Sequence, residues 1–103
     1  MQVIRPHSKE ELNEYYQLRW ELLRKPLGLD QGSEKDNLEN ISTHRVIKKD
    51  NRFIAVGRLH FIDKKTSQIR YMGVEEEFQK KGLGKLIVEE FERISIKKNI
   101  FKI

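Results

Sequence analysis

The chain has 103 residues, a length that suits one domain with a single hydrophobic core. Its 21 Lys and Arg residues outnumber its 16 Asp and Glu residues, which gives a net charge of +5. Cysteine is absent, so disulfides, thiolate metal sites and a cysteine nucleophile are excluded.

The opening segment, MQVIRPHSKE, lacks the apolar core of a signal peptide. After a short extended start at 2–5, Ser8 and Glu11 have the capping-box spacing of a helix N-terminus. Apolar residues then recur at helical spacing until Pro26, which predicts a helix over 9–24.

The charged residue Arg19 lies beside the apolar stripe of this helix. Its side chain either extends to solvent or is held by a buried carboxylate. A glycine-bearing loop follows, and Ser33 predicts the start of a short, weakly patterned second helix at 34–41.

Three strands are expected next, at 43–49, 52–62 and 67–74. Asp50–Asn51 joins the first two, because both residues tolerate the left-handed backbone of a tight hairpin. The strand at 52–62 is largely apolar on both faces, which predicts a central strand covered on both sides. Strict alternation assigns its side chains to two faces, the first with Phe53, Ala55, Gly57, Leu59 and Phe61 and the second with Ile54, Val56, Arg58, His60 and Ile62.

A polar loop at 75–81 leads to a strongly amphipathic helix at 83–98, and a last extended segment begins at 100–103. The order of elements predicts an α+β (α/β three-layer) domain over 1–103, with a mixed, mainly antiparallel sheet flanked by helices. The longest apolar run, 53–56, is far too short to span a bilayer, so we expect a soluble, cytoplasmic protein without a membrane partner.

The strand-to-helix junction is the most informative segment of the sequence. The loop Gln79-Lys80-Lys81-Gly82-Leu83-Gly84-Lys85 opens the last helix. Glycines let backbone N–H groups approach a ligand, and a helix N-terminus adds unpaired N–H groups and partial positive charge. These features predict a pyrophosphate cradle, and the alternative interpretation is an ordinary turn with helix-cap glycines. A Walker-type phosphate loop is excluded, because no Gly-Lys-Ser/Thr occurs.

Gln79-x-x-Gly82-x-Gly84 resembles the acetyl-CoA signature Q/R-x-x-G-x-G/A of the GNAT superfamily of N-acetyltransferases. The phrase from Met72 to Gly84 is similar to that family's fourth strand, loop and third helix, and the phrase 18–28 is similar to the first helix and loop of one bacterial subgroup. The resemblance covers nearly the whole chain and implies a GNAT-like acyl-CoA N-acyltransferase fold.

The resemblance also implies acetyl-CoA as co-substrate and transfer of its acetyl group to an amine that the sequence does not identify. Backbone groups of the loop would bind the pyrophosphate, and those of the preceding strand would pair with the pantetheine arm. A backbone N–H near Val74 would stabilise the thioester oxyanion. The implied cofactor-binding residues are Met72, Val74, Gln79, Lys80, Lys81, Gly82, Leu83, Gly84 and Lys85.

Members of the family usually continue past the fifth strand with a helix and two more strands, whereas this chain ends at Ile103. We therefore expect a C-terminally short form, or a partner chain that completes the sheet. An exposed sheet edge would favour a homodimer.

Three residues are candidates for proton transfer. Glu75 follows the third long strand and could act as a base, His60 titrates in the right range, and Tyr71 could donate a proton. The alternatives are a solvated carboxylate, a histidine without a catalytic role and a packing tyrosine. Arg58 and Arg70, on adjacent strands, could bind an acidic acceptor group or pair with nearby acids.

Two other classes of function are weighed. The short chain motivates a CoA-binding module without catalysis, and the net charge alone motivates a nucleic-acid-binding domain. Lysine pairs are scattered and separated by acids, without interleaved aromatics, which disfavours nucleic acid. The three histidines have no ligand spacing, so no metal site is predicted.

Overall fold

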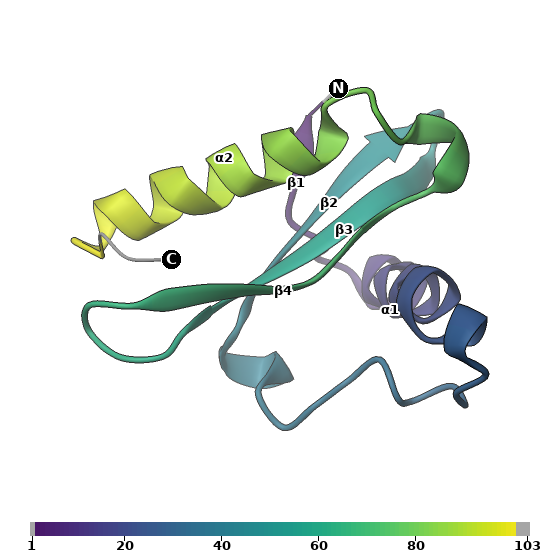
Figure 1. Cartoon of the computed structure of the whole chain (residues 1–103), viewed down its shortest axis with the longest axis horizontal. Coiled ribbons are helices and arrows are strands. Elements are labelled where there is room, and N and C mark those ends of the chain that lie inside the picture. Colours follow the sequence, from purple (N-terminus) through teal and green to yellow (C-terminus); the bar gives the residue numbers. More distant parts are fainter. Residues whose placement is uncertain (1, 101–103) are drawn as a thin grey trace.

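The structure is a computed structural model, and it describes residues 2–100. Two helices lie on opposite faces of a four-stranded sheet, with α2 on one side and α1 on the other (Figure 1). The predicted three-layer α+β architecture is confirmed. Its elements are β1 (Val3–Ile4), α1 (Lys9–Leu23), β2 (Thr43–Lys49), β3 (Arg52–Phe61), β4 (Ser67–Val74) and α2 (Leu83–Lys97), with 3₁₀ turns η1 (Lys25–Leu27), η2 (Glu39–Ile41) and η3 (Glu76–Phe78).

The sheet has the order β1-β2-β3-β4, and each neighbouring pair is antiparallel. The strand β3 is internal and buried on both faces, as its apolar sequence predicts. Asp50 and Asn51 join it to β2 with φ values of 49° and 66°, which confirms the predicted left-handed hairpin turn. Among the described strands, β4 forms one edge of the sheet.

A bulge near the start of β3 corrects the predicted face assignment. Ile47 pairs with Ala55 and Lys48 pairs with Phe53, so Ile54 is an extra residue in β3. The extra residue moves Phe53 to the side of α1, and both Ile54 and Ala55 belong to the core cluster on the side of α2. From Val56 onward the alternation follows the predicted pattern, because Val56 packs toward α1 and Leu59 toward α2.

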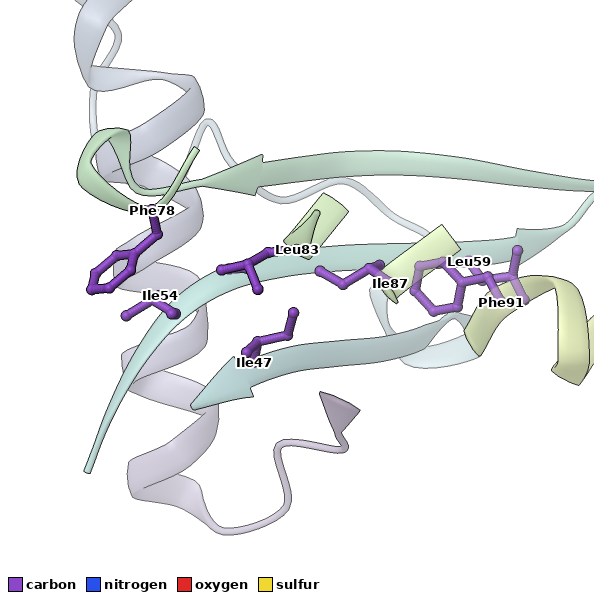
Figure 2. Close-up of a cluster of buried hydrophobic side chains, with 8 residues drawn as sticks. Ile47, Ile54, Leu59, Phe78, Leu83, Ile87 and Phe91 are labelled. Atoms are coloured by element: carbon purple, nitrogen blue, oxygen red, sulfur yellow. The ribbon is translucent and has the colours of Figure 1, made fainter. Parts of the chain in front are cut away.

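Each face of the sheet has its own core. Figure 2 shows the larger cluster, in which side chains from β2, β3, η3 and α2 meet between the sheet and the helix. The helix approaches closely at Gly57, where an added Cβ would lie 2.7 Å from Ile87 Cγ2. On the other face, Tyr15 and Leu18 of α1 pack against Val46 and Val56.

The N-terminus of α1 has the predicted capping box. The Ser8 hydroxyl accepts the Glu11 N–H at 3.1 Å, and the Glu11 carboxylate accepts the Ser8 N–H at 3.2 Å. Hydrogen bonds from the His7 and Ser8 N–H groups to this carboxylate lower the pKa of the Glu11 carboxyl. Both long helices end within one residue of their predicted limits.

The predicted helix at 34–41 is wrong, because only the turn η2 forms within it. Side chains satisfy the local backbone instead: Asp36 Oδ1 accepts the Leu38 N–H, and Glu39 Oε2 accepts the Asp36 N–H. Acidic side chains that bond nearby N–H groups compete with helix formation in this way. Both carboxylates also bind buried arginines from distant elements, which fixes the segment as an ordered loop.

The predicted extended segment at 100–103 lies outside the described residues except for Ile100. Ile100 is buried, and its N–H donates to the Ser95 carbonyl at 2.8 Å, just after α2. Among residues 2–100, no helix combines the length and apolar character needed to cross a membrane.

Candidate functional site

A second bulge lies in the middle of β4. Val56 pairs with Gly73 and Arg58 pairs with Arg70, so Tyr71 and Met72 both lie opposite Gly57. Tyr71 has a left-handed backbone with φ of 53°, which is unusual for a bulky residue. The bulge bends β4 and directs the Tyr71 side chain toward Arg19 and Arg58, on the side of the sheet that α1 covers.

Beyond the bulge, β4 presents backbone groups on its outer edge. The Glu75 N–H donates to the Ile54 carbonyl at 2.9 Å. Because antiparallel strands alternate between bonded and non-bonded pairs, Val74 directs its N–H and carbonyl away from β3. The outer carbonyl of Val74 accepts the Gln79 Nε2 group at 3.1 Å, which ties the following loop to the strand.

The loop after β4 is anchored in the core. Phe78 in η3 is buried in the cluster beneath α2, and three cations lie over its ring. Two of these belong to the β2–β3 hairpin region, and the third is Lys81, whose Nζ lies 5.7 Å from the ring centroid. The anchor holds the chain in place just before α2 begins.

The loop presents a row of backbone donors. Within residues 2–100, no acceptor binds the N–H groups of 80–85. Gly82 caps α2 with a φ of 80°, and an added Cβ there would meet no atom within 4 Å. Lys80, Lys81 and Lys85 are exposed around this open space. The combination suits an anionic group with several oxygen acceptors, because the donors, the helix dipole and the lysines act together.

A groove of about 660 Å³ runs between the C-terminal end of α1 and the outer edge of β4. Gln79 lies at the loop end of the groove, and Met72 marks its other end at the bulge. A smaller recess of about 220 Å³ shares Leu23 and Met72 with the groove and adds Arg24, Arg70 and Tyr71. The shared residues make the two hollows neighbours along β4.

Two arginines are fully buried beside these hollows. Arg19 binds Glu39 through both terminal nitrogens, at 2.8 and 3.0 Å, and a third hydrogen bond runs from Arg19 to the Glu34 carbonyl. Arg58 Nη1 donates to Asp36 at 2.7 Å and to Glu39 at 2.9 Å. Arg19 does not extend to solvent, and a carboxylate holds it, that of the partly buried Glu39.

These contacts lower the pKa values of both acids. Hydrogen bonding to Arg58 holds the pKa of the Asp36 carboxyl well below its usual range. Burial raises the pKa of Glu39, but hydrogen bonds from Arg19 and from the Asp36 N–H outweigh burial and lower it overall. Both acids therefore stay ionised at neutral pH and neutralise the buried guanidinium groups.

A second polar chain joins α1 to β2. The Tyr15 hydroxyl lies 2.7 Å from His44 Nδ1, and His44 Nε2 lies 2.9 Å from the Glu39 carbonyl. A carbonyl only accepts, so Nε2 carries the proton and Nδ1 accepts from Tyr15 when the ring is neutral. Burial lowers the pKa of His44 and favours that neutral ring.

The three predicted catalytic residues do not gather at one point. Tyr71 lines the recess beside the bulge. Both carboxylate oxygens of Glu75 lie within 2.8 Å of Arg52 Nη1, and Glu75 does not line the groove. His60 pairs with Gln68 and lies six positions along β3 from the residue opposite Glu75, about 20 Å at strand spacing. Glu75 and His60 therefore cannot contact the same reacting atom.

Several residues at the hollows were missed by sequence reasoning. Leu22 and Leu23 of α1 form one wall of the groove, and the carboxylate-bearing residues Glu21 and Glu76 lie along it. An added Cβ at Gly73 would lie 3.2 to 3.4 Å from Leu22 and Leu23, so this glycine lets α1 approach β4. Two adjacent leucines at the end of a helix are the available signal, but they equally indicate core packing.

The comparisons with known proteins agree with this geometry. A family model described as "Acetyltransferase (GNAT) family" matches residues 8–103. Solved structures with the same fold include a GNAT-family acetyltransferase from Staphylococcus aureus Mu50, with a TM-score of 0.78, 16% identity, and coverage of 96% of this chain and 68% of that chain. The chain belongs to the GNAT acetyltransferase family and has its fold.

Two further structures share the fold. An aminoglycoside 6'-N-acetyltransferase complexed with coenzyme A has a TM-score of 0.77 at 10% identity, over 96% of this chain and 57% of that chain. A predicted acetyltransferase with acetyl-CoA from Clostridium acetobutylicum has a TM-score of 0.73 at 14% identity, over 99% of this chain and 77% of that chain. The present chain thus spans between just over half and three quarters of the length of these proteins.

Proposed function

We propose that the chain binds acetyl-CoA and transfers the acetyl group to an amine. The observation that carries the proposal is the row of free N–H groups at 80–85 beside the open outer edge of β4. The two relatives described above that hold CoA or acetyl-CoA support it, because they share the fold.

In this proposal the loop binds the CoA pyrophosphate. The backbone N–H groups of residues 80–85 donate to phosphate oxygens, and Lys80, Lys81 and Lys85 add positive charge. Gln79 helps shape the loop, because its side chain holds the Val74 carbonyl. The open space at Gly82 allows close approach of the phosphates.

The pantetheine arm then extends along β4 as an added strand. Met72 and Val74 line the groove, so their backbone groups are the proposed partners of the amides of the arm, and the Val74 carbonyl would first release the Gln79 side chain. This arrangement directs the thioester toward the bulge at Tyr71 and Met72. A backbone N–H near Val74, at the outer edge of β4, is the proposed donor to the thioester oxygen.

The transfer requires two proton steps. The protonated amine first loses one proton, and its nitrogen forms the C–N bond with the acetyl carbon as the C–S bond breaks. The nitrogen loses a second proton, the leaving sulfur gains one, and the net reaction releases one proton. Of the predicted proton-transfer residues, Tyr71 is closest to the proposed thioester end. Glu75 would first have to leave Arg52, and His60 would act from the far end of the strand pair.

A non-catalytic CoA-binding module is the second candidate. The observation that favours it is the separation of Glu75, His60 and Tyr71, which do not meet at the bulge. Both candidates require CoA binding, and only the first requires turnover.

Two measurements separate these possibilities. Thermal unfolding with acetyl-CoA and with CoA should show a rise in Tm, since ligands that bind only the native state stabilise it. Release of free thiol in the presence of an amine panel then reports transfer. No rise in Tm at millimolar ligand would refute both candidates, and a rise without amine-dependent thiol release would leave the binding module.

A further inference from the structure

Four guanidinium groups surround the ring of Tyr71. Their central carbons lie 4.0 to 5.2 Å from its centroid: 4.0 Å for Arg19, 4.7 Å for Arg58, 5.1 Å for Arg70 and 5.2 Å for Arg24. Cations favour the faces of aromatic rings, but four like charges also repel one another. The cluster therefore requires anions.

Two of the four arginines are neutralised within the chain. Arg19 and Arg58 are fully buried, and Asp36 and Glu39 supply one carboxylate for each. The nearby Glu34 carboxylate accepts the Gly32 N–H and forms no ion pair within residues 2–100. The charges of Arg19 and Arg58 are thus nearly balanced by those of Asp36 and Glu39.

The other two arginines keep their positive charge largely unmatched. Arg24 Nε donates to the Ser33 carbonyl, and within the described chain its terminal nitrogens reach no acceptor. Arg70 is 46% exposed, and its nearest carboxylate oxygen, on Asp36, lies 3.8 Å away, beyond hydrogen-bond distance. The Oδ1 atom of that carboxylate accepts from Arg58 and the Leu38 N–H, and the Oδ2 atom, which faces Arg70, accepts the Tyr71 hydroxyl at 3.5 Å.

Both unmatched guanidinium groups line the recess of about 220 Å³, and Tyr71 forms part of its wall. The recess adjoins the bulge end of the groove, whereas Gln79 and the phosphate-binding loop lie at the other end. An anion in the recess therefore belongs to a molecule other than the CoA pyrophosphate. The volume is below that of a pocket for a drug-sized ligand, which indicates a small group.

We propose that the acceptor amine also carries an anionic group, a carboxylate or a phosphate, which Arg24 and Arg70 bind against the ring of Tyr71. The proposal rests on the proposed acetyl transfer and names its substrate class. The planar guanidinium fork matches the oxygens of either group. With the anion in the recess, the amino group of a compact substrate reaches the bulge, where the thioester is expected.

Matched pairs of amines test the proposal. β-Alanine is compared with β-alaninamide, and phosphoethanolamine with ethanolamine, so that each pair differs in the anionic group. We expect kcat/KM to be roughly tenfold or more higher for the anionic member of at least one pair, because hydrogen bonds to charged groups are the strong ones. The pair with the larger preference identifies carboxylate or phosphate. A preference below threefold in both pairs overturns the proposal.

Variants locate the effect. Arg70→Gln and Arg24→Gln should raise the KM of the anionic amine roughly tenfold and leave the KM of acetyl-CoA unchanged. Arg93→Gln, which removes an exposed guanidinium on α2 outside the recess, is the matched control and should change neither value. An unchanged amine KM in both recess variants contradicts the assignment.

A direct binding measurement separates failure of this inference from failure of the proposed function. Titration of β-alanine and phosphoethanolamine without acetyl-CoA, followed by chemical shifts, should perturb residues of the recess in the wild type and not in Arg70→Gln. If acetyl-CoA neither binds nor reacts, this titration alone decides for or against the anion site. If transfer occurs but neutral amines react equally well, acetyl transfer stands and the anion site is refuted.

Discussion

The space above Gly82 offers a sharp test of the phosphate-binding loop. Replacement with Asp or Asn introduces side chains of nearly equal shape that differ by one negative charge. An added Cβ at this position meets no protein atom within 4 Å, so both side chains start into open space. Both residues also tolerate the left-handed backbone that Gly82 adopts, at a cost of about 1 kcal/mol.

The charge of Asp would face the bound phosphates. Two unit charges 4 Å apart repel by about 1 kcal/mol in water and about 4 kcal/mol at an effective dielectric constant near 20. This range corresponds to a loss of affinity of about fivefold to several hundredfold for each phosphate charge. Gly82→Asn measures the effect of side-chain bulk, and the difference between Gly82→Asp and Gly82→Asn measures the effect of charge.

The assay is the Kd of CoA by isothermal titration at low and high salt, with Tm as a check of folding. We expect Gly82→Asp to bind at least fivefold more weakly than Gly82→Asn. The gap should narrow as salt screens the repulsion. If the two variants fold and bind CoA within twofold of each other, the phosphates do not lie above Gly82 and the proposed cradle is refuted.

Three further predictions concern stability. Glu39→Gln leaves Arg19 buried without its carboxylate and should lower the free energy of unfolding by about 3–5 kcal/mol. A decrease in this free energy of less than about 1 kcal/mol in urea denaturation would contradict the stabilising role of the pair. Gly57→Ala places a Cβ 2.7 Å from Ile87 and should lower the free energy of unfolding by about 1–3 kcal/mol. Gly84→Ala lies within α2, and its Cβ would have its nearest contact at 3.9 Å, so this variant should be neutral or more stable by up to about 1 kcal/mol. Equal effects of the two variants in thermal melts would refute the close approach of α2. The pKa of His44 is lowered in the folded state, so the unfolded chain binds more protons than the folded chain below about pH 6.5. The free energy of unfolding should therefore decrease as the pH falls through that value. His44→Gln should flatten this part of the pH profile, and an unchanged slope would show that another group causes it.

Local patterns predicted the elements that depend on neighbouring residues. The capping box at Ser8 and the hairpin at Asp50–Asn51 have the predicted geometry, because their signals lie within a few residues of the structures that they form. The amphipathic stripe of α2 likewise identified the side that faces the sheet. These agreements are strongest where one short segment specifies its own backbone.

Features that depend on distant partners were missed. The bulge at Ile54 inverts two side chains, and nothing in the alternating apolar sequence of β3 shows that it must occur. The segment 34–41 has a helix-like beginning, but its acids bind distant arginines. Glu39 binds Arg19, 20 residues away in sequence, and Asp36 binds Arg58, 22 residues away. Such long-range ion pairs leave no local pattern.

The candidate site likewise has one part with a local sequence signal and another part that depends on distant elements. The loop from Gln79 to Lys85 was identified by its glycines and its resemblance to an acetyl-CoA signature, both of which are local. The groove wall on α1 and the arginine cluster require α1, β3 and β4 to come together. For that reason the sequence predicts Arg58 and Arg70 as candidates for binding an acidic group, but it does not single out Arg24.

The ion pairs of Arg19 and Arg58 also make the connection between α1 and β2 part of the cooperative core. This segment has little regular secondary structure, and a segment of that kind ordinarily opens without disturbing the rest of a domain. Here, opening of the connection would leave two guanidinium groups in an apolar interior without their carboxylates. We therefore expect the ion-paired part of this connection, around Asp36 and Glu39, to open with the sheet rather than before it, so the amide hydrogens of Asp36 and Leu38 should exchange on the timescale of global unfolding.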